Sequence, residues 1–414
     1  MRILVDQSGY DLLNIGDVAM LQSCVTRLRQ LWPDAEIMVV CHSPARLASY
    51  CPGTVAIGQT FADRPGFRAV PRRPRLAAEQ AWKMAAPYFS GRLGSLGRGR
   101  PPRTAIQAVR AADIVVASGG GYVTDTWWWH AAGVLSLLAL AQREGKPTAM
   151  FGQGIGPITQ RGLRTQAGAV LRRLTVLGLR EARVGHDLAL SLGTRPGAIT
   201  VTGDDALELI PPTVPGGHAL GVNMRVSDYA GVDPAAAQTV GEVVTQAADA
   251  YGAPLVALPV SRYPVDGDLS AIRALLRREH SRPGTVLDDL ASPEALATAA
   301  SGCRAVVTGS YHAAVFSLAQ GVPAVCLTKS SYYDAKFAGL SELFPGACFV
   351  GSLSQPDFAD WLRAAIDQAW NLPAPARAAA REAAGRQRQA GREAYAQFQV
   401  AAGLVATDRE GLLR

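Results

Sequence analysis

The sequence predicts an α/β protein with two Rossmann-like lobes that face a cleft. Short runs of β-branched residues alternate with helical stretches, which is the pattern of βαβ units and parallel sheets. A cluster of prolines and glycines at residues 211–217 interrupts this alternation once, after which the alternation starts again. With 414 residues, 48% of them hydrophobic, the chain is long and apolar enough to build a core in each lobe.

The same pattern sets the expected boundaries. We expect an N-terminal lobe over residues 1–210, a C-terminal lobe over residues 218–372, and a helical tail rich in Ala, Arg and Gln over residues 373–414. Strands are predicted at residues 2–7, 36–42, 54–58, 113–119, 147–154, 175–180 and 199–203 of the first lobe, and at residues 220–224, 254–260, 285–287, 305–308 and 324–327 of the second.

Positive charge is concentrated in one segment. The formal net charge is +7, and residues 64–103 carry nine arginines and Lys83 against Glu79. This basic segment is either a solvated loop or a surface that contacts phosphates or an anionic membrane. A zinc finger, an aromatic RNA-binding motif and a regular helix-turn-helix pattern are all absent from the sequence, so nucleic acid is not a predicted partner.

Other features exclude several classes of protein. The apolar runs reach about 10 residues, short of the ~18 that a membrane span needs, and no secretory leader is recognisable. The six cysteines are scattered without a CxxC pair, which is typical of reduced, buried thiols. We expect a cytoplasmic protein, with peripheral contact at the inner face of the membrane through residues 64–103 as an option. The sequence shows no HExxH motif and no compact carboxylate cluster, so it predicts no metal and no cofactor.

Polar and glycine-rich motifs follow the predicted strands of the first lobe, where open α/β sheets bind ligands. The first is Asn14-Ile15-Gly16-Asp17, in which Gly16 allows a close approach and Asn14 or Asp17 can instead cap a helix. The next comprises three glycines that form an anion-friendly turn: Gly119, Gly120 and Gly121. Gln153 lies in the Gly-Gln-Gly-Ile-Gly-Pro segment that ends the following strand.

Charged residues end two further strands of this lobe. Arg180 closes a strand that is otherwise apolar, which indicates either a ligand contact or a structural ion pair with Glu181. Asp204 follows the last strand and can orient a hydroxyl or Arg180, or simply cap the next helix.

The second lobe supplies its own polar residues at strand ends. Asn223 and Arg225 lie at the end of its first predicted strand. Ser310 and His312 lie where another strand passes into a helix, a position from which a histidine can face the cleft. The other five histidines have no comparable setting.

The order of these motifs resembles the polysaccharide pyruvyl transferase family. The resemblance covers residue 14 to about residue 339 and rests on the N-x-G-D opening, the triple glycine, the Gly-Gln-Gly-Ile-Gly-Pro turn, the Arg180–Glu181 pair and Asp204. Its most specific part is the stretch from residue 312 to residue 323, which reads HAAVFSLAQGVP.

The resemblance implies a fold like that of GT-B glycosyltransferases and the transfer of pyruvate from phosphoenolpyruvate to two hydroxyls of a sugar, forming a cyclic ketal. By motif, His312 matches the family's catalytic histidine, and Arg180 and Lys336 match residues that bind phosphoenolpyruvate. The expected donor-binding residues are Arg180, Lys336, Arg225, Asn223 and Ser310, with the donor mainly on the C-terminal lobe. The acceptor is a sugar, a glycan or a lipid-linked intermediate, expected on the N-terminal lobe. Its expected contacts are Asn14, Asp17, Gly119, Gly120, Gly121, Gln153 and Asp204.

Two positions depart from the family pattern. Ser310 stands where the family usually has an arginine, so Arg225 or Arg262 would have to supply the missing cation. About four extra residues, 328–331, precede the Y-D-x-K match, so that Lys329 competes with Lys336 for its role. These departures leave open whether this branch uses the usual donor.

The residues suit the chemistry that the resemblance implies. Phosphoenolpyruvate carries a carboxylate and a phosphate, which Arg and Lys bind well. Proton transfer at its carbon and at the sugar hydroxyl needs an acid–base group, for which His312 is the candidate. Three alternatives remain open: a GT-B glycosyltransferase that uses a nucleotide-sugar, a transferase acting on a small natural product, and a non-enzymatic binding protein.

Overall fold

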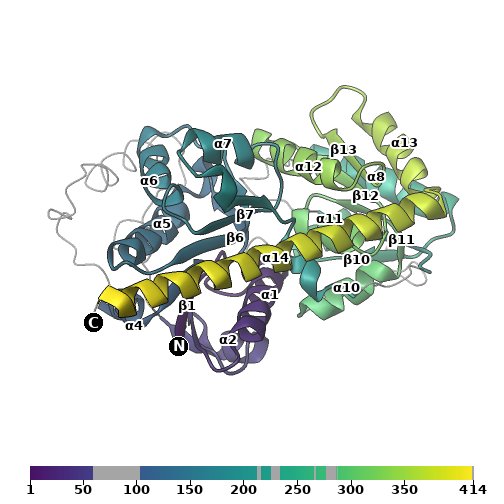
Figure 1. The fold of residues 1–414 in the computed structure, drawn as a ribbon. Helices are drawn as coiled ribbons and strands as arrows, with labels where there is room; N and C mark the ends of the chain where they lie inside the picture. The colour runs from purple at the N-terminus through teal and green to yellow at the C-terminus, as the bar shows by residue number, and fades with distance from the viewer. Residues whose placement is uncertain are drawn as a thin grey trace. The chain divides into compact units, whose positions relative to one another are not determined.

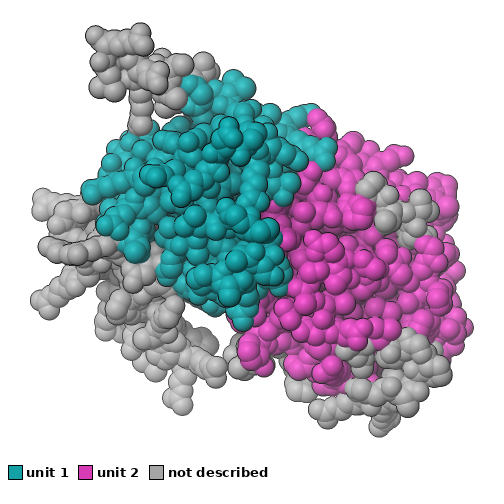
Figure 2. Space-filling view, turned by 90° about the horizontal axis from the view of Figure 1, so that it is seen from below, with its two compact units in different colours: residues 1–12, 24–202, 391–414 teal, residues 13–23, 203–390 magenta. Residues whose placement is uncertain are grey.

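The computed structural model describes residues 1–58, 103–211, 216–224, 234–264, 267–276, 286 and 288–412. The chain forms two compact units, which Figure 2 shows in teal and magenta. Unit 1 comprises Met1–Leu12, Cys24–Thr202 and Gly391–Arg414, and unit 2 comprises Leu13–Ser23 and Gly203–Ala390. Residues 13–23, which the sequence places in the first lobe, therefore pack with the second.

Unit 1 is built on a parallel sheet in the order β3-β2-β1-β4-β6-β7-β8, and β5 pairs with β6. The strands are β1 Arg2–Asp6, β2 Glu36–Val40, β3 Val55–Ile57, β4 Ile114–Ala117, β5 Gly120–Val123, β6 Thr148–Ile155, β7 Val176–Leu179 and β8 Ile199–Val201. Strands β4, β6 and β7 are buried along their whole length, as parallel strands are when helices cover both faces of a sheet.

The helices of unit 1 cover this sheet (Figure 1). They are α2 Pro44–Tyr50, α4 Arg103–Ala111, α5 Trp128–Arg143, α6 Arg161–Leu171 and α7 Gly185–Ser191, with 3₁₀ turns at Asp125–Trp127 and Pro196–Ala198. Helix α1, Ile15–Leu31, begins in unit 2 and continues in unit 1. The core between helices and sheet includes Val115, Leu138 and Leu177, all fully buried.

Unit 2 has a smaller parallel sheet in the order β10-β9-β11-β12-β13. Its strands are β9 Ala219–Asn223, β10 Leu255–Ala257, β11 Cys303–Thr308, β12 Ala324–Thr328 and β13 Cys348–Ser352. Its helices are α8 Pro234–Ala250, α9 Asp268–Leu275, α10 Pro293–Ser301, α11 Tyr311–Leu318, α12 Ser331–Leu343 and α13 Phe358–Trp370, with a 3₁₀ turn at Asp205–Leu209. Its core includes Leu220, Val307 and Leu362, each fully buried.

The chain ends in the long helix α14, Ala374–Leu412, drawn in yellow in Figure 1. Its residues up to Ala390 belong to unit 2, and those from Gly391 belong to unit 1. Within unit 1 the ring of Tyr395 stacks on Phe151 of β6 with 3.6 Å between ring centroids. Because both rings are fully buried, the end of α14 is part of the core of unit 1.

Candidate active site

The N-x-G-D motif forms the start of α1 and is held by unit 2. The side-chain oxygen of Asn14 accepts hydrogen bonds from the backbone N–H groups of Gly16 (3.0 Å) and Asp17 (3.3 Å). Asn14 thus caps the helix, one of the two roles that the sequence left open. Asn14 also forms a β-bridge with Ser261, and the N–H of Ile15 donates to the carbonyl of Val260 (2.9 Å).

Gly16 packs against the imidazole ring of His312. A Cβ atom at position 16 would overlap Cγ and Nδ1 of that ring, so only glycine fits here without a shift. His312 lies in the first turn of α11, directly after β11, and its side chain is 10% exposed. The structure therefore brings the first motif of the sequence and the candidate catalytic histidine together within unit 2.

Asp204 faces the other side of this ring. One carboxylate oxygen of Asp204 accepts a hydrogen bond from the N–H of Ala206 (2.9 Å), which caps the 3₁₀ turn that follows. The other oxygen lies 3.6 Å from Nε2 of His312, too far for an ordinary hydrogen bond but close enough for a strong electrostatic contact. The side chain of Asp204 is only 1% exposed, so little water screens this contact.

Asn223 and Ser310 lie in a buried network behind α11. The amide nitrogen of Asn223 donates to the carbonyl of Leu258 and to Asp268, both at 2.9 Å, and its oxygen lies 3.3 Å from Oγ1 of Thr308. The N–H of Ser310 donates to the same hydroxyl (2.8 Å). The network connects the end of β9 to the start of α11. The donor contacts predicted for Asn223 and Ser310 stay predictions.

Lys336 of α12 lies among three tyrosine rings. Its ammonium nitrogen is 4.1 Å from the ring centroid of Tyr332, 5.5 Å from that of Tyr333 and 5.8 Å from that of Tyr311, distances typical of cation–π contacts. Tyr311 in turn packs edge-on against the ring of His312, with 5.7 Å between centroids. Lys336 is thus close to His312 through one shared neighbour.

Other candidate cations of unit 2 have different settings. Lys329 comes directly after β12, and the choice between Lys329 and Lys336 stays open. Arg262 forms two hydrogen bonds with Asp289, described below. Arg225 and the basic segment up to residue 102 lie outside the described residues.

Arg180 belongs to unit 1, where it follows β7. It is 1% exposed, and its Nε lies 3.5 Å from a carboxylate oxygen of Glu181, so the ion pair that the sequence suggested is present. Its backbone N–H donates to the carbonyl of Gln153 (3.0 Å). A Cβ atom at Gly154 would come within 2.6 Å of the guanidinium, so this glycine makes room for Arg180 as Gly16 does for His312.

Gln153 and the glycine triplet are also in unit 1. Gln153 is fully buried, and its amide nitrogen donates to the carbonyl of Ser118 (2.6 Å) and the hydroxyl of Tyr122 (3.0 Å). Gly119, Gly120 and Gly121 do not lead directly into a helix, because Gly120 and Gly121 begin the short strand β5. A Cβ at Gly120 would overlap the ring of Tyr122. Their predicted acceptor contacts stay predictions.

Sequence reasoning missed several residues of these networks. Thr308 ends β11 and Asp268 begins α9, and the roles of both side chains depend on Asn223, which is far from them along the chain. The sequence does contain a signal for two of the tyrosines around Lys336. Tyr332 and Tyr333 precede the lysine by four and three residues, so on a helix they lie on the same face as Lys336.

Two findings concern the described residues as a whole. Within them, groups of three or more His, Cys, Asp or Glu side chains that could hold a metal ion do not occur. A search of the same residues for a helix long and apolar enough to cross a membrane finds none.

Solved structures share the fold of this chain at low sequence identity. CalG4, the calicheamicin glycosyltransferase, is 15% identical (TM-score 0.54, 97% of each chain covered). The glycotransferase of kitacinnamycin is 13% identical (TM-score 0.53, 98% of this chain and 97% of that chain). A UDP-GlcNAc 2-epimerase from Neisseria meningitidis is 11% identical (TM-score 0.54, 98% of this chain and 100% of that chain). These likenesses confirm the predicted GT-B-like fold of two Rossmann-like lobes.

A family model decides what the fold alone leaves open. No curated protein matches the chain. The model described as polysaccharide pyruvyl transferase matches residues 14–331, from the Asn14 cap through His312 to the start of α12. This range contains both glycines that pack against the candidate functional side chains. The chain therefore belongs to the polysaccharide pyruvyl transferase family.

Proposed function

We propose that this transferase moves the pyruvate unit of phosphoenolpyruvate onto two hydroxyls of a sugar or glycan and forms a cyclic ketal, with His312 as the general acid and base. The observation that carries this proposal is the setting of His312. Its ring lies against Gly16 of the N-x-G-D motif, at the start of a helix, with the carboxylate of Asp204 at 3.6 Å from Nε2.

This setting suits a group that must both give and take a proton. The Asp204 carboxylate lies 3.6 Å from Nε2 of the ring, and the positive end of the α11 dipole favours an anion such as phosphate nearby. Gly16 on one side and Asp204 on the other limit how the ring can turn. We assign Asp204 as a positioning residue for His312 in addition to its predicted contact with the acceptor.

In the proposed reaction His312 acts first as an acid and then as a base. His312 in its protonated form gives a proton to the methylene carbon of phosphoenolpyruvate, which becomes a methyl group and leaves positive charge on the adjacent carbon. A sugar hydroxyl attacks that carbon and its proton returns to the imidazole. The C–O bond to phosphate breaks, the second hydroxyl closes the ketal, and its proton leaves with the phosphate. Acid–base catalysis of this kind contributes roughly 10²–10⁴-fold.

The anionic donor also needs cations. Arg180 and Lys336 are the proposed ligands of its phosphate and carboxylate, and Arg225, Asn223 and Ser310 are the further candidates. The tyrosine rings around Lys336 support this assignment, since they hold a flexible side chain in one place and so lower the entropy cost of binding. In this scheme the residues of the chain supply all acid–base and anion-binding groups.

The direct test follows phosphate release and ketal formation from phosphoenolpyruvate with a panel of sugar and glycan acceptors. We expect turnover with the wild-type chain and a loss of about 10²-fold or more in His312→Gln. The matched control is His186→Gln, a histidine of α7 whose side chain is 43% exposed and which should behave as wild type. Full activity of His312→Gln would exclude His312 as the general acid and base.

A second candidate function rests on the fold. The structural neighbours include glycosyltransferases, so glycosyl transfer from a nucleotide-sugar is the alternative. Repeating the assay with UDP- and GDP-sugars separates the two. Release of nucleoside diphosphate, with no phosphate released from phosphoenolpyruvate, would favour the alternative.

A further inference from the structure

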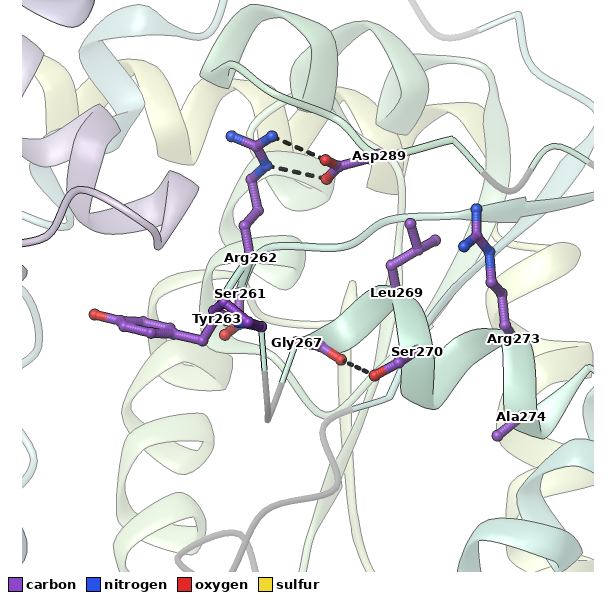
Figure 3. A pocket seen from close by; sticks show the side chains of 10 residues that line it. Ser261, Arg262, Tyr263, Gly267, Leu269, Ser270, Arg273, Ala274 and Asp289 are labelled. Atoms are coloured by element: carbon purple, nitrogen blue, oxygen red, sulfur yellow. Dashed lines mark hydrogen bonds and ion pairs between the residues drawn. The ribbon is translucent and has the colours of Figure 1, made fainter. Parts of the chain in front are cut away.

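A pocket of about 570 Å³ lies in unit 2 beyond the carboxyl end of the edge strand β10 (Figure 3). Arg262 and Asp289 form its upper side in the view of Figure 3, and Ser270 and Arg273 line it from α9. Tyr263 lies at its rim and is 38% exposed. Its size is in the range of pockets that bind small molecules, roughly 300–1,000 Å³.

The pocket lining carries two arginines, Arg262 and Arg273, and one carboxylate, that of Asp289. Nε and Nη2 of Arg262 donate to the two carboxylate oxygens of Asp289 at 3.0 and 2.8 Å, and Arg273 also attracts this carboxylate. The hydrogen bonds from Arg262 lower the pKa of Asp289, so the pair is ionised at neutral pH. The paired guanidinium and carboxylate offer donors and acceptors side by side, which suits a ring with several hydroxyls.

Hydrogen bonds hold the backbone where the loop that carries Arg262 and Tyr263 begins. The carboxylate of Asp268, itself 1% exposed, accepts hydrogen bonds from the N–H groups of Val260 (2.9 Å) and Ser261 (3.0 Å). It also accepts one from the Asn223 side chain at 2.9 Å. A site held in shape before the ligand arrives loses less entropy on binding. These bonds fix the backbone on which Arg262 of the pocket is placed.

The same loop connects the pocket to His312. The N–H of Arg262 donates to the carbonyl of Leu13 (2.7 Å), Ser261 bridges Asn14, and Ile15 donates to Val260. The next residue, Gly16, packs against the His312 ring. Three residue steps of at most ~3.6 Å each, roughly 11 Å in all, separate the Leu13 contact of Arg262 from the Gly16 contact of His312.

We propose that this pocket binds a second sugar ring of the acceptor, so that the preferred acceptor is at least a disaccharide. The ring hydroxyls would bond to the Arg262–Asp289 pair and to Ser270, and Tyr263 would pack against a face of the ring. The role as acceptor site rests on the proposed function, whereas the binding of a disaccharide does not.

Equilibrium binding to the full chain, followed by ligand-observed NMR without phosphoenolpyruvate, tests the pocket. The probes are maltose, cellobiose and lactose, each compared with the methyl glycoside of its terminal ring. We expect at least one disaccharide to bind more tightly than its monosaccharide. Tyr263→Ala should weaken its binding about tenfold and abolish that preference, as should Arg262→Gln combined with Asp289→Asn.

The matched control is Arg363→Gln combined with Asp360→Asn, which removes an exposed Arg–Asp pair of α13 in the same unit and should leave binding unchanged. The pocket assignment fails if no probe disaccharide binds, or if the Tyr263 and Arg262–Asp289 variants bind like the control. It also fails if UMP or pyrophosphate, but no sugar, binds in a way that these variants abolish.

Phosphate release separates this inference from the proposed function. Turnover of phosphoenolpyruvate with pocket variants that bind disaccharides like wild type would leave the function standing and overturn the pocket. Disaccharide binding that the variants abolish, in a chain that never releases phosphate from phosphoenolpyruvate, would leave the pocket standing and overturn the function.

Discussion

At two positions of this chain a glycine is needed, because a neighbouring side chain lies where a Cβ atom would be. Gly16 lies against the imidazole of His312 and Gly154 against the guanidinium of Arg180. In each case the neighbour is a large polar group that is almost fully buried, so it cannot move away without losing its contacts. The role of these two glycines is to make room for polar side chains and not to form turns.

We expect Gly16→Ala to lower pyruvyl transfer at least tenfold, because the added methyl group displaces the His312 ring from Asp204. The measurement is kcat/KM together with a thermal melt that shows the variant is folded. Gly197→Ala is the control, since nothing lies within 4 Å of a Cβ at that position. Unchanged kcat/KM in folded Gly16→Ala would show that the ring position does not matter.

At the scale of elements, the start of α11 places the candidate histidine, and the last part of α14 completes the core of unit 1. Helix α11 begins directly after β11, which places His312 at the carboxyl edge of the second sheet, where parallel sheets bind ligands. Helix α14 contributes to the hydrophobic core of unit 1. Its last part enters the core of unit 1 through Tyr395 and Phe398, which pack on Phe151.

Tyr395→Ala should destabilise the protein by about 3–5 kcal/mol, the usual cost of removing a large buried aromatic side chain. Chemical denaturation followed by circular dichroism measures this loss. Val400→Ala is the matched change on the same helix and should cost well under 1 kcal/mol, because Val400 is 65% exposed. Equal effects of the two variants would mean that α14 does not contribute to the core of unit 1.

At the scale of the whole molecule, neither unit is a continuous stretch of chain. Residues 13–23 complete unit 2, and residues from Gly391 complete unit 1. A fragment cut at residue 210 would therefore lose the part of α14 that packs on Phe151. The folded state depends on segments from both ends of the sequence.

The acid stability of the molecule should depend on His130, which is buried beside Tyr10 and Tyr122. Burial lowers the pKa of His130 from 6.5 to about 4. Because the unfolded chain then binds the proton more tightly, the free energy of unfolding is highest above pH 6.5. It falls as the pH drops towards 4, by roughly 3 kcal/mol at most.

Urea denaturation at several pH values across the window of this titration, roughly pH 7 to 4, measures that loss. His130→Gln should flatten this part of the profile, while His218→Gln, at an exposed position, should leave it unchanged. An unaltered profile in His130→Gln would assign the acid loss to other groups.

The fold class and the identity of the motifs were predictable from the order of the amino acids alone. Alternating β-branched and helical runs report local burial, so they predicted two parallel α/β sheets, and the motif order indicated the family that the family model confirms. Capping by Asn14 and Asp204 was also foreseeable, because a cap depends on neighbours two or three residues away.

The contacts between these residues became visible only in the folded chain. The tertiary structure placed Asn14 and Gly16 with the second sheet, set Asp204 against His312 and surrounded Lys336 with tyrosines. It also showed that Gly120 and Gly121 form a strand. Such contacts join residues that are far apart along the chain, and periodicity reports how each residue is buried but not which partner buries it.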